Sequence, residues 1–405
     1  MPTLFQINSG VNIGSTGRIV EQIGQYAKSN GWVSYVAYGR KNNNSKSNTI
    51  KIGNFIDFLI HILYSRIFDR HGLGSVKATK KLIKKILIIN PDIIHLHNIH
   101  GYYINYQVLF EFLSGSDIPV VWTLHDCWSM TGHCSHFSNI NCVKWKTSCH
   151  HCPKMKNYPT SLFIDRSFKN FKFKKELFNS VFRITIVTVS NWLDSLVKES
   201  YLSKIPLRVI NNGIDLDVFY PLSDCADIKN KYGINQKFIL LGVATAWSVG
   251  KGLNDYYKLR EVLSNDYALV LVGLSKKQIK ALHLNILGIE RTENLTELSA
   301  LYSASDIVLN LSYQETFGLT TVEGFACGTP GIVFNCTASP ELITPETGKI
   351  VEPGNIGQLK QAIEEIRLNG KDFYSINCRK RAEDFYNKDN RYEEYIQLYD
   401  ELIKN

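Results

Sequence analysis

The sequence contains no long apolar run and does not open on a hydrophobic leader. Its longest apolar stretch, residues 55–67, is interrupted by Asp57, His61 and Arg66, whereas a membrane-spanning helix needs about 20 predominantly apolar residues. The chain begins with a short strand-like run at residues 4–7, without the basic flank and cleavage site of a signal peptide. We therefore expect a protein that neither spans a membrane nor is exported, and that works in the cytoplasm.

Internal repeats and low-complexity tracts are lacking as well. Apolar residues make up 44% of the chain and charged residues 20%, which is typical of a soluble globular protein. With 405 residues, the chain is longer than a usual single domain. The length therefore predicts two domains.

The net charge of +9 favours anionic partners such as nucleotides or phospholipid head groups. Two segments mix lysines with apolar residues in the manner of helices that rest on a membrane surface, residues 77–87 and 168–175. The alternative for both is a solvated outer helix. Peripheral contact with the cytoplasmic face of the inner membrane is thus a hypothesis, whereas nucleic-acid binding lacks a recognition motif and is not expected.

Short β-rich runs alternate with longer helical patterns along the chain, which indicates an α/β fold with parallel sheets. Strands are predicted at residues 4–8, 33–38, 92–97, 119–125, 184–190, 238–244, 268–273, 306–311 and 331–334. A turn-rich segment at 209–215 separates two halves. We predict two Rossmann-like domains, 1–212 and 221–387, with a C-terminal helix at 388–405 packing back on the first. The ligand is expected in the cleft between them, at the carboxyl ends of the strands.

The most informative stretch is residues 315–330, where Glu315 precedes a predicted helix that starts near Gly318 and contains Glu323. A helix start offers backbone N–H groups and a positive dipole end to a diphosphate, and glycine allows close approach. Carboxylates accept hydrogen bonds from the vicinal hydroxyls of ribose and hexose. Two glutamates at this spacing also occur by chance on protein surfaces.

This stretch resembles the E-x7-E motif of the family 4 glycosyltransferases, which have the GT-B fold, and the match extends through Phe-Gly-Leu, Val-Glu-Gly and Ala-Cys-Gly-Thr-Pro. The resemblance covers most of the chain. It implies that Glu315 contacts the donor sugar, that Glu323 holds the nucleotide ribose, and that the amides of Gly318, Leu319 and Thr320 bind the diphosphate. Ile289 and Glu290 lie about where the family contacts the base.

Three further segments agree with the resemblance. Gly14, Gly17 and Arg18 form a glycine-containing loop after the first strand, similar to the loop that faces donor and acceptor in the family. His125 closes a strand, where the family has a histidine that reaches the transferred sugar. Lys251 resembles the lysine that neutralises the diphosphate leaving group. The resemblance therefore implies catalytic roles for His125, Lys251 and Glu315.

The sequence departs from the family at Thr245, where an arginine usually stands six residues before the lysine. One cationic contact to the leaving phosphate is thus absent or is supplied from elsewhere, for which Arg18 is a candidate. The resemblance implies no obligatory metal for catalysis, because helix amides and Lys251 can carry the anionic charge. The Asp-Leu-Asp run at 215–217 resembles a metal motif of other glycosyltransferases, but its place in the linker indicates a structural role.

A cysteine and histidine cluster follows His125. Cys134, Cys142, Cys149 and Cys152 include one Cys-x-x-Cys pair and are compatible with a structural zinc site. The alternatives are reduced cysteines packed in a loop, or two disulfides under oxidising conditions. Similar inserts occur in a bacterial subgroup that resembles colanic-acid-type transferases. In that context the contacts expected for the acceptor are His97, Asn98, His100 and Tyr102.

The resemblance implies a retaining, metal-independent hexosyltransferase that uses a UDP- or GDP-linked sugar. Its expected acceptor is a growing surface polysaccharide (O-antigen, capsule or exopolysaccharide) carried on a lipid diphosphate. The alternative is a non-catalytic nucleotide-sugar-binding relative, which the missing arginine makes conceivable.

Overall fold

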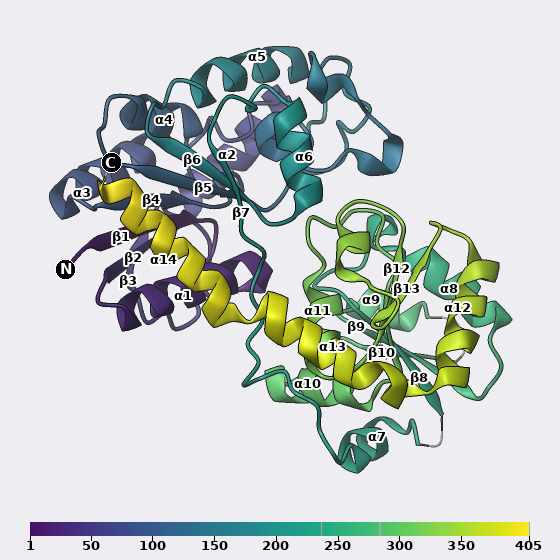
Figure 1. Cartoon of the computed structure of the whole chain (residues 1–405). Helices are drawn as coiled ribbons and strands as arrows, with labels where there is room; N and C mark the ends of the chain where they lie inside the picture. The colour runs from purple at the N-terminus through teal and green to yellow at the C-terminus, as the bar shows by residue number, and fades with distance from the viewer. Residues whose placement is uncertain (236, 283–284, 405) are drawn as a thin grey trace. The chain divides into compact units, whose positions relative to one another are not determined.

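The chain is divided into two compact units in the computed structural model, which describes residues 1–235, 237–282 and 285–404 (Figure 1). Unit 1 comprises residues 1–211 and the C-terminal segment that begins at Arg391, and unit 2 comprises residues 212–390. The predicted domains were 1–212 with 388–405, and 221–387. Each unit is described separately below.

Unit 1 is built on a seven-stranded parallel sheet with the strand order β3-β2-β1-β4-β5-β6-β7. The three strands β4, β5 and β6 are buried along their whole length, as expected for a parallel sheet covered on both faces. The strands are β1 (Thr3–Asn8), β2 (Val33–Tyr38), β3 (Asn48–Lys51), β4 (Ile93–Leu96), β5 (Val120–Leu124), β6 (Ile184–Thr188) and β7 (Leu207–Val209). Helices before β7 are α1 (Gly14–Ser29), α2 (Phe55–Phe68), α3 (Val76–Ile89), α4 (Tyr106–Ser114), α5 (Ser167–Phe178) and α6 (Asn191–Glu199).

Unit 2 repeats the plan with a six-stranded parallel sheet in the order β10-β9-β8-β11-β12-β13. Its strands are β8 (Phe238–Val243), β9 (Tyr267–Val272), β10 (Ile286–Ile289), β11 (Ile307–Asn310), β12 (Gly331–Phe334) and β13 (Gly348–Val351). Its helices are α7 (Ala226–Tyr232), α8 (Leu253–Val262), α9 (Lys276–Lys280), α10 (Leu295–Ala304), α11 (Leu319–Ala326), α12 (Ile356–Asn369) and α13 (Lys371–Tyr386). The predicted α/β class with two Rossmann-like parallel sheets is confirmed.

All nine predicted strands are present, whereas β3, β7, β10 and β13 were not predicted. The missed strands are only three or four residues long and lie at the edges of their sheets. An edge strand has a neighbour on one side only and is shorter and less apolar than a central one, so its pattern is weak.

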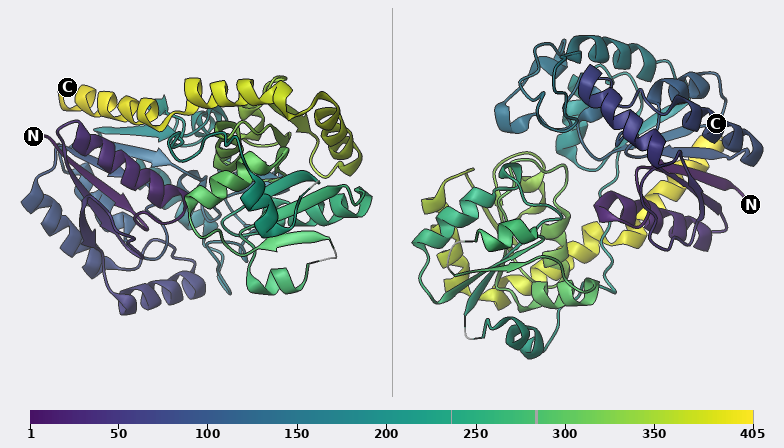
Figure 2. Two further views of the ribbon diagram at one scale, coloured as in Figure 1. Left: turned by 90° about the horizontal axis from the view of Figure 1, so that it is seen from below. Right: turned by 180° about the vertical axis from the view of Figure 1, so that it is seen from behind.

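The last helix, α14 (Lys388–Lys404), has its apolar stripe buried. From Arg391 onward it belongs to unit 1, where two of its tyrosines meet the sheet: the hydroxyl of Tyr399 lies 2.6 Å from His95 Nδ1, and that of Tyr395 lies 3.1 Å from Thr123 Oγ1. Figure 2 shows this helix in yellow at the C-terminal end of the chain. The periodicity of the tyrosines thus predicted a helix that completes the core of unit 1. None of the helices among the described residues has the length and apolarity needed to span a membrane.

Candidate functional site

In unit 2 the predicted donor residues follow the carboxyl ends of three strands of the same sheet. Lys251 comes after β8, Glu290 directly follows β10, and Glu315 lies in the loop after β11. Because all strands of the sheet are parallel, their carboxyl ends lie along the same edge of the sheet, the one that runs across the strands. Ligands of such sheets bind at this edge, so the topology gathers the predicted residues where a ligand is expected.

Helix α11 begins at this edge with an unusual start. Gly318 occupies the N-cap position with a φ of +105°, and no side chain caps the helix. L side chains rarely adopt this φ, so the backbone conformation favours glycine at position 318. Leu319 and Thr320 form the first turn, whose amides carry the positive end of the helix dipole. This start suits an anionic group such as a diphosphate.

Lys251 and Glu315 are joined by an ion pair, with 2.5 Å between Nζ and Oε1. The pairing depends on Gly252, which has a φ of +72° and approaches the end of β11 so closely that a Cβ would lie 2.0 Å from the carbonyl oxygen of Leu311. The Lys251 side chain is 36% exposed and that of Glu315 is 16% exposed. Both charges therefore remain within reach of a ligand from solvent.

Glu323 is deeply buried within α11 and accepts a hydrogen bond of 2.7 Å from the hydroxyl of Tyr302 on α10. Tyr302 is itself held in place, because its carbonyl oxygen accepts a bond from the Thr329 hydroxyl. The second glutamate of the motif is therefore an oriented carboxylate and not a surface residue. Tyr302 is a residue of the site that was missed at the level of sequence.

The structure places the remaining predicted residues of unit 2 in different surroundings. Ile289 is buried at the end of β10, and Glu290 is exposed beside it. Thr245 is exposed in the loop after β8 and so leaves an open position at the same edge. Asp215 forms a 2.6 Å ion pair with Lys388, which agrees with the structural role predicted for the Asp-Leu-Asp run.

In unit 1 the glycine segment is placed differently from the prediction. Gly14, Gly17 and Arg18 lie in the first turns of α1 and not in a loop, because α1 already begins at Gly14. The loop itself is residues 9–13, and its Asn12 N–H bonds back to the carbonyl oxygen of Gly17. The sequence places the glycines at the right end of the first strand, but it does not show that the helix begins this early.

A chain of buried and half-buried side chains connects three adjacent strands of unit 1. Gln6 in β1 donates through Nε2 to the Val20 carbonyl, so its Oε1 faces His97 Nε2 at 3.1 Å. His97 Nδ1 lies 3.1 Å from His125 Nε2 at the end of β5. Burial lowers the pKa of His125 to about 4 and that of His97 well below its usual value, so both rings are neutral at pH 7.

This chain determines which nitrogen carries each proton. The Gln6 oxygen can only accept, so His97 Nε2 must be protonated and His97 Nδ1 must be an acceptor. His125 Nε2 is therefore the donor to His97, and its proton stays on Nε2. Gln6 was missed at the level of sequence, although a polar residue between Phe5 and Ile7 in a buried strand is a signal in itself.

We expect 15N imidazole chemical shifts to show neutral Nε2–H rings for both His97 and His125 from about pH 5 to pH 8. In Gln6→Leu the acceptor is removed, and we expect the His125 signal to move toward a mixture of the two tautomers. A single Nδ1–H signal for His125 in the wild-type protein would contradict the assignment.

The predicted acceptor residues lie near His125 but differ in exposure. Asn98 is partly exposed, whereas His100 and Tyr102 are buried. His100 Nε2 lies 2.8 Å from Asp126. Burial raises the pKa of Asp126, but His100 outweighs this effect and brings it to about 2. Asn98 is thus the predicted acceptor contact that is best placed to reach a ligand, and His100 positions Asp126.

The four cysteines of the insert come close to one another. A hydrogen bond joins the thiols of Cys134 and Cys152 and lowers the pKa of Cys152 to about 7, while burial raises that of Cys149 to about 11. Within the part of the chain that the structure describes, no group of three His, Cys, Asp or Glu side chains is arranged to hold a metal ion. All nine cysteines are unpaired as disulfides. This geometry favours reduced cysteines packed in a loop, and zinc at these residues stays a prediction.

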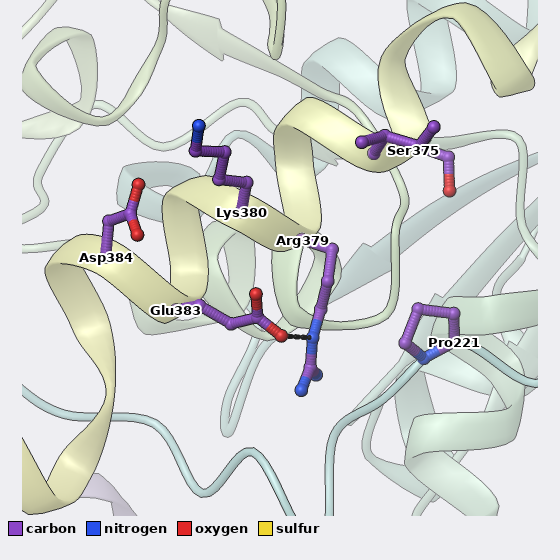
Figure 3. A pocket seen from close by; sticks show the side chains of 7 residues that line it. Pro221, Ser375, Arg379, Lys380, Glu383 and Asp384 are labelled. Carbon is purple, nitrogen blue, oxygen red and sulfur yellow. Dashed lines mark hydrogen bonds and ion pairs between the residues drawn. The ribbon is translucent and has the colours of Figure 1, made fainter.

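A surface pocket of about 520 Å³ lies elsewhere in unit 2, along α13 (Figure 3). Its Arg379 pairs with Glu383 and donates to the carbonyl oxygen of Ala326, the last residue of α11. The pocket is therefore at the end of α11 opposite to Gly318. Because Arg379 serves to hold the helix end, we assign the pocket a structural role.

Two family models match the chain. The model of Glycosyltransferase Family 4 matches residues 16–218, and that of Glycosyl transferases group 1 matches residues 225–385. The two matches together cover both units. They include the first turns of α1, His125, Lys251 and the segment from Glu315 to Glu323.

Similar proteins include bacterial glycosyltransferases. The putative colanic acid biosynthesis glycosyl transferase WcaC of Escherichia coli K12 is 25% identical, over 98% of this chain and 100% of that protein. An N,N'-diacetylbacillosaminyl-diphospho-undecaprenol alpha-1,3-N-acetylgalactosaminyltransferase of Campylobacter jejuni is 25% identical over 60% of this chain and 69% of its own length. The solved sucrose-phosphate synthase of Thermosynechococcus elongatus is 16% identical, covers all of both chains and has a TM-score of 0.75. This last likeness confirms the predicted GT-B fold.

Proposed function

Because this chain belongs to glycosyltransferase family 4, we propose that it is a retaining hexosyltransferase acting in surface-polysaccharide synthesis. The donor is a UDP- or GDP-linked hexose, and the acceptor is a glycan on a lipid diphosphate. The observation that carries this proposal is the uncapped start of α11, which is flanked by the pair of Lys251 and Glu315 and followed by the buried Glu323. These groups supply an anion site and carboxylates for sugar hydroxyls in one place.

The proposed roles in unit 2 follow from charge. The first-turn amides of α11 hold the diphosphate, and Lys251 neutralises it as the bond to the sugar breaks. Lys251 now bonds Glu315, so a bound diphosphate competes for its ammonium group. When Lys251 turns to the phosphate, both Glu315 oxygens become available to hydroxyls of the donor sugar. Donor binding and positioning of the sugar are thereby coupled through one ion pair.

Tyr302 is proposed to orient Glu323 toward the ribose hydroxyls. We expect Tyr302→Phe to weaken donor binding by about tenfold, because a hydrogen bond to a charged group is worth about 1.5–3 kcal/mol. Isothermal titration with the nucleoside diphosphate measures the change. Tyr257→Phe on α8 is a control that removes a phenol elsewhere in the unit. Equal affinities of Tyr302→Phe and wild type would contradict the role.

Retention of configuration is proposed to proceed without a protein nucleophile. In this scheme the departing phosphate oxygen takes the proton of the acceptor hydroxyl, and the new glycosidic bond forms on the face that the leaving group vacates. Because α11 amides and Lys251 carry the negative charge, we propose that no metal ion is needed. The exposed Thr245 makes this charge compensation weaker than in relatives with an arginine there, so we expect a slow enzyme.

A lipid-linked acceptor is supported by the Campylobacter relative, whose name specifies a diphospho-undecaprenol acceptor. It requires the protein to work at a membrane surface, and we propose the cytoplasmic face, where nucleotide sugars are made. The net charge of +9 agrees with contact to anionic lipid.

A panel of UDP- and GDP-hexoses tests the function. The purified protein is incubated with each donor, with and without a lipid-diphosphate disaccharide, and release of nucleoside diphosphate is measured. We expect one donor to be consumed and the anomeric proton of the product to show the donor's configuration by NMR. Binding of a donor without turnover for any member of the panel would favour the non-catalytic alternative.

A further inference from the structure

Helix α2 of unit 1 exposes apolar residues and buries polar ones, the reverse of a surface helix in a soluble protein. Its outward stripe is between 36% and 69% exposed and consists of Phe55, Ile56, Leu59, Ile60, Leu63 and Ile67. The fully buried positions are His61 and Ser65. Contiguous apolar surface of this kind marks an interaction site.

Hydrogen bonds determine which face of α2 is turned toward the rest of unit 1. His61 Nε2 accepts from the backbone N–H groups of Gly72 and Gly74, at 3.2 and 3.3 Å, and its Nδ1 lies 2.9 Å from the Ser75 hydroxyl. A capping box between Asn54 and Asp57 fixes the start of the helix. Turning the stripe inward would separate the buried His61 ring from these three partners, so the stripe is held outward.

A second apolar segment extends the stripe. Leu162, Phe163 and Ile164 are between 40% and 80% exposed, and the Leu162 N–H bonds to the carbonyl oxygen of Arg66 near the end of α2, at 2.8 Å. We call the stripe and these three residues the α2 surface. In the right-hand view of Figure 2, α2 lies on the outer side of unit 1.

The charge around the α2 surface indicates which kind of partner binds there. Residues 55–89 contain seven basic and two acidic residues. Both acidic residues make contacts within unit 1, because Asp57 belongs to the capping box and the buried Asp69 lies 2.7 Å from His133 Nδ1. The five lysines of α3 are exposed, and the N-cap residue of this helix, Ser75, contacts His61 of α2. Apolar side chains flanked by cations match an anionic lipid surface, whereas a second copy would bring like charges together.

We propose that the α2 surface inserts into the head-group region of an anionic bilayer and holds unit 1 on the membrane. The sequence had indicated residues 77–87 and 168–175 for this contact, and α2 was considered only as a membrane-spanning candidate. The identity of the acceptor in that membrane rests on the proposed function, but the binding to lipid does not.

Vesicle sedimentation of the full chain tests the proposal. We expect the wild-type protein to sediment with vesicles of phosphatidylcholine and phosphatidylglycerol, and only weakly with phosphatidylcholine alone. Leu59→Glu combined with Leu63→Glu is expected to lower the partition coefficient by about tenfold or more. The matched control is Leu368→Glu with Ile376→Glu, which changes two exposed apolar residues of unit 2 and is expected to have no effect.

A second variant guards against misfolding of α2: Phe163→Ser with Ile164→Ser lies in a loop and is expected to weaken binding as well. Failure of the wild type to bind anionic vesicles would overturn the proposal. So would unchanged vesicle binding of both α2-surface variants, and sedimentation equilibrium would then show whether they convert a dimer into a monomer.

Donor hydrolysis in solution separates this proposal from the proposed function. The α2-surface variants are expected to retain hydrolysis, because the surface is remote in sequence from the donor residues of unit 2. Vesicle binding without turnover would leave the α2 surface standing and sink the function. Turnover without vesicle binding would support the proposed function and overturn the proposal for the α2 surface.

Discussion

Replacing Glu315 by glutamine is expected to lower the transfer rate by about 10²–10³-fold. The variant keeps the shape of the side chain but removes the charge that pairs with Lys251 at 2.5 Å and that is proposed to bind the donor sugar. Removal of one preorganised group at the reacting centre costs about 3 kcal/mol, which gives this magnitude. Initial rates with the donor found in the panel measure it.

The control for this prediction is Glu346→Gln, which removes an exposed carboxylate of the same unit and should leave the rate unchanged. A second comparison uses Lys251→Met and the double variant. Because the two residues share an ion pair and a ligand, we expect the double variant to be little slower than either single one. Independent, multiplying losses would mean that the two residues do not act together, and an active Glu315→Gln would refute the assigned role.

Unit 1 is expected to lose stability steeply as the pH falls below about 6.5. Burial lowers the pKa of five of its histidines: that of His61 and His125 to about 4, and that of His71, His95 and His97 well below the usual value. The unfolded chain takes up a proton at each of them near pH 6.5, whereas the folded unit does not. The stabilising contribution is therefore complete above pH 6.5 and is lost as the pH falls toward 4.

Each histidine lowers the free energy of unfolding by about 1.4 kcal/mol per pH unit. Over one to two pH units, the combined loss from five histidines is on the order of the free energy of unfolding of a typical domain. Urea unfolding followed by tryptophan fluorescence measures it, since five of the six tryptophans lie in residues 1–211. Unit 2 contains a single histidine, His283, which lies outside the described residues, and it should respond much less.

His125→Asn is expected to reduce the dependence of the unfolding free energy on pH by about one proton. His150→Gln is the control, because it removes a histidine whose side chain is exposed in the folded unit. The same urea midpoint at pH 7.5 and pH 5.5 would contradict the burial of these histidines.

Much of the fold was accessible from local pattern alone. Alternating apolar runs and helical periods determined the parallel α/β class, and the tyrosine spacing determined the last helix, because periodicity reports directly which face of an element is buried. The placement of Gly318 before α11 was equally predictable, since other residues rarely adopt its backbone conformation. The motif around Glu315 and Glu323 then led to the family that the comparisons show.

What only the tertiary structure decided are relations between residues that are far apart in the chain. Gln6, His97 and His125 come from three strands, and their proton assignment exists only once those strands are neighbours. The ion pair of Lys251 with Glu315 depends on the close packing at Gly252, and the outward turn of the α2 stripe depends on bonds from His61 to Gly72, Gly74 and Ser75. Sequence determines which residues can form such contacts. Their geometry and protonation follow from burial and from partners that the folded chain alone brings together.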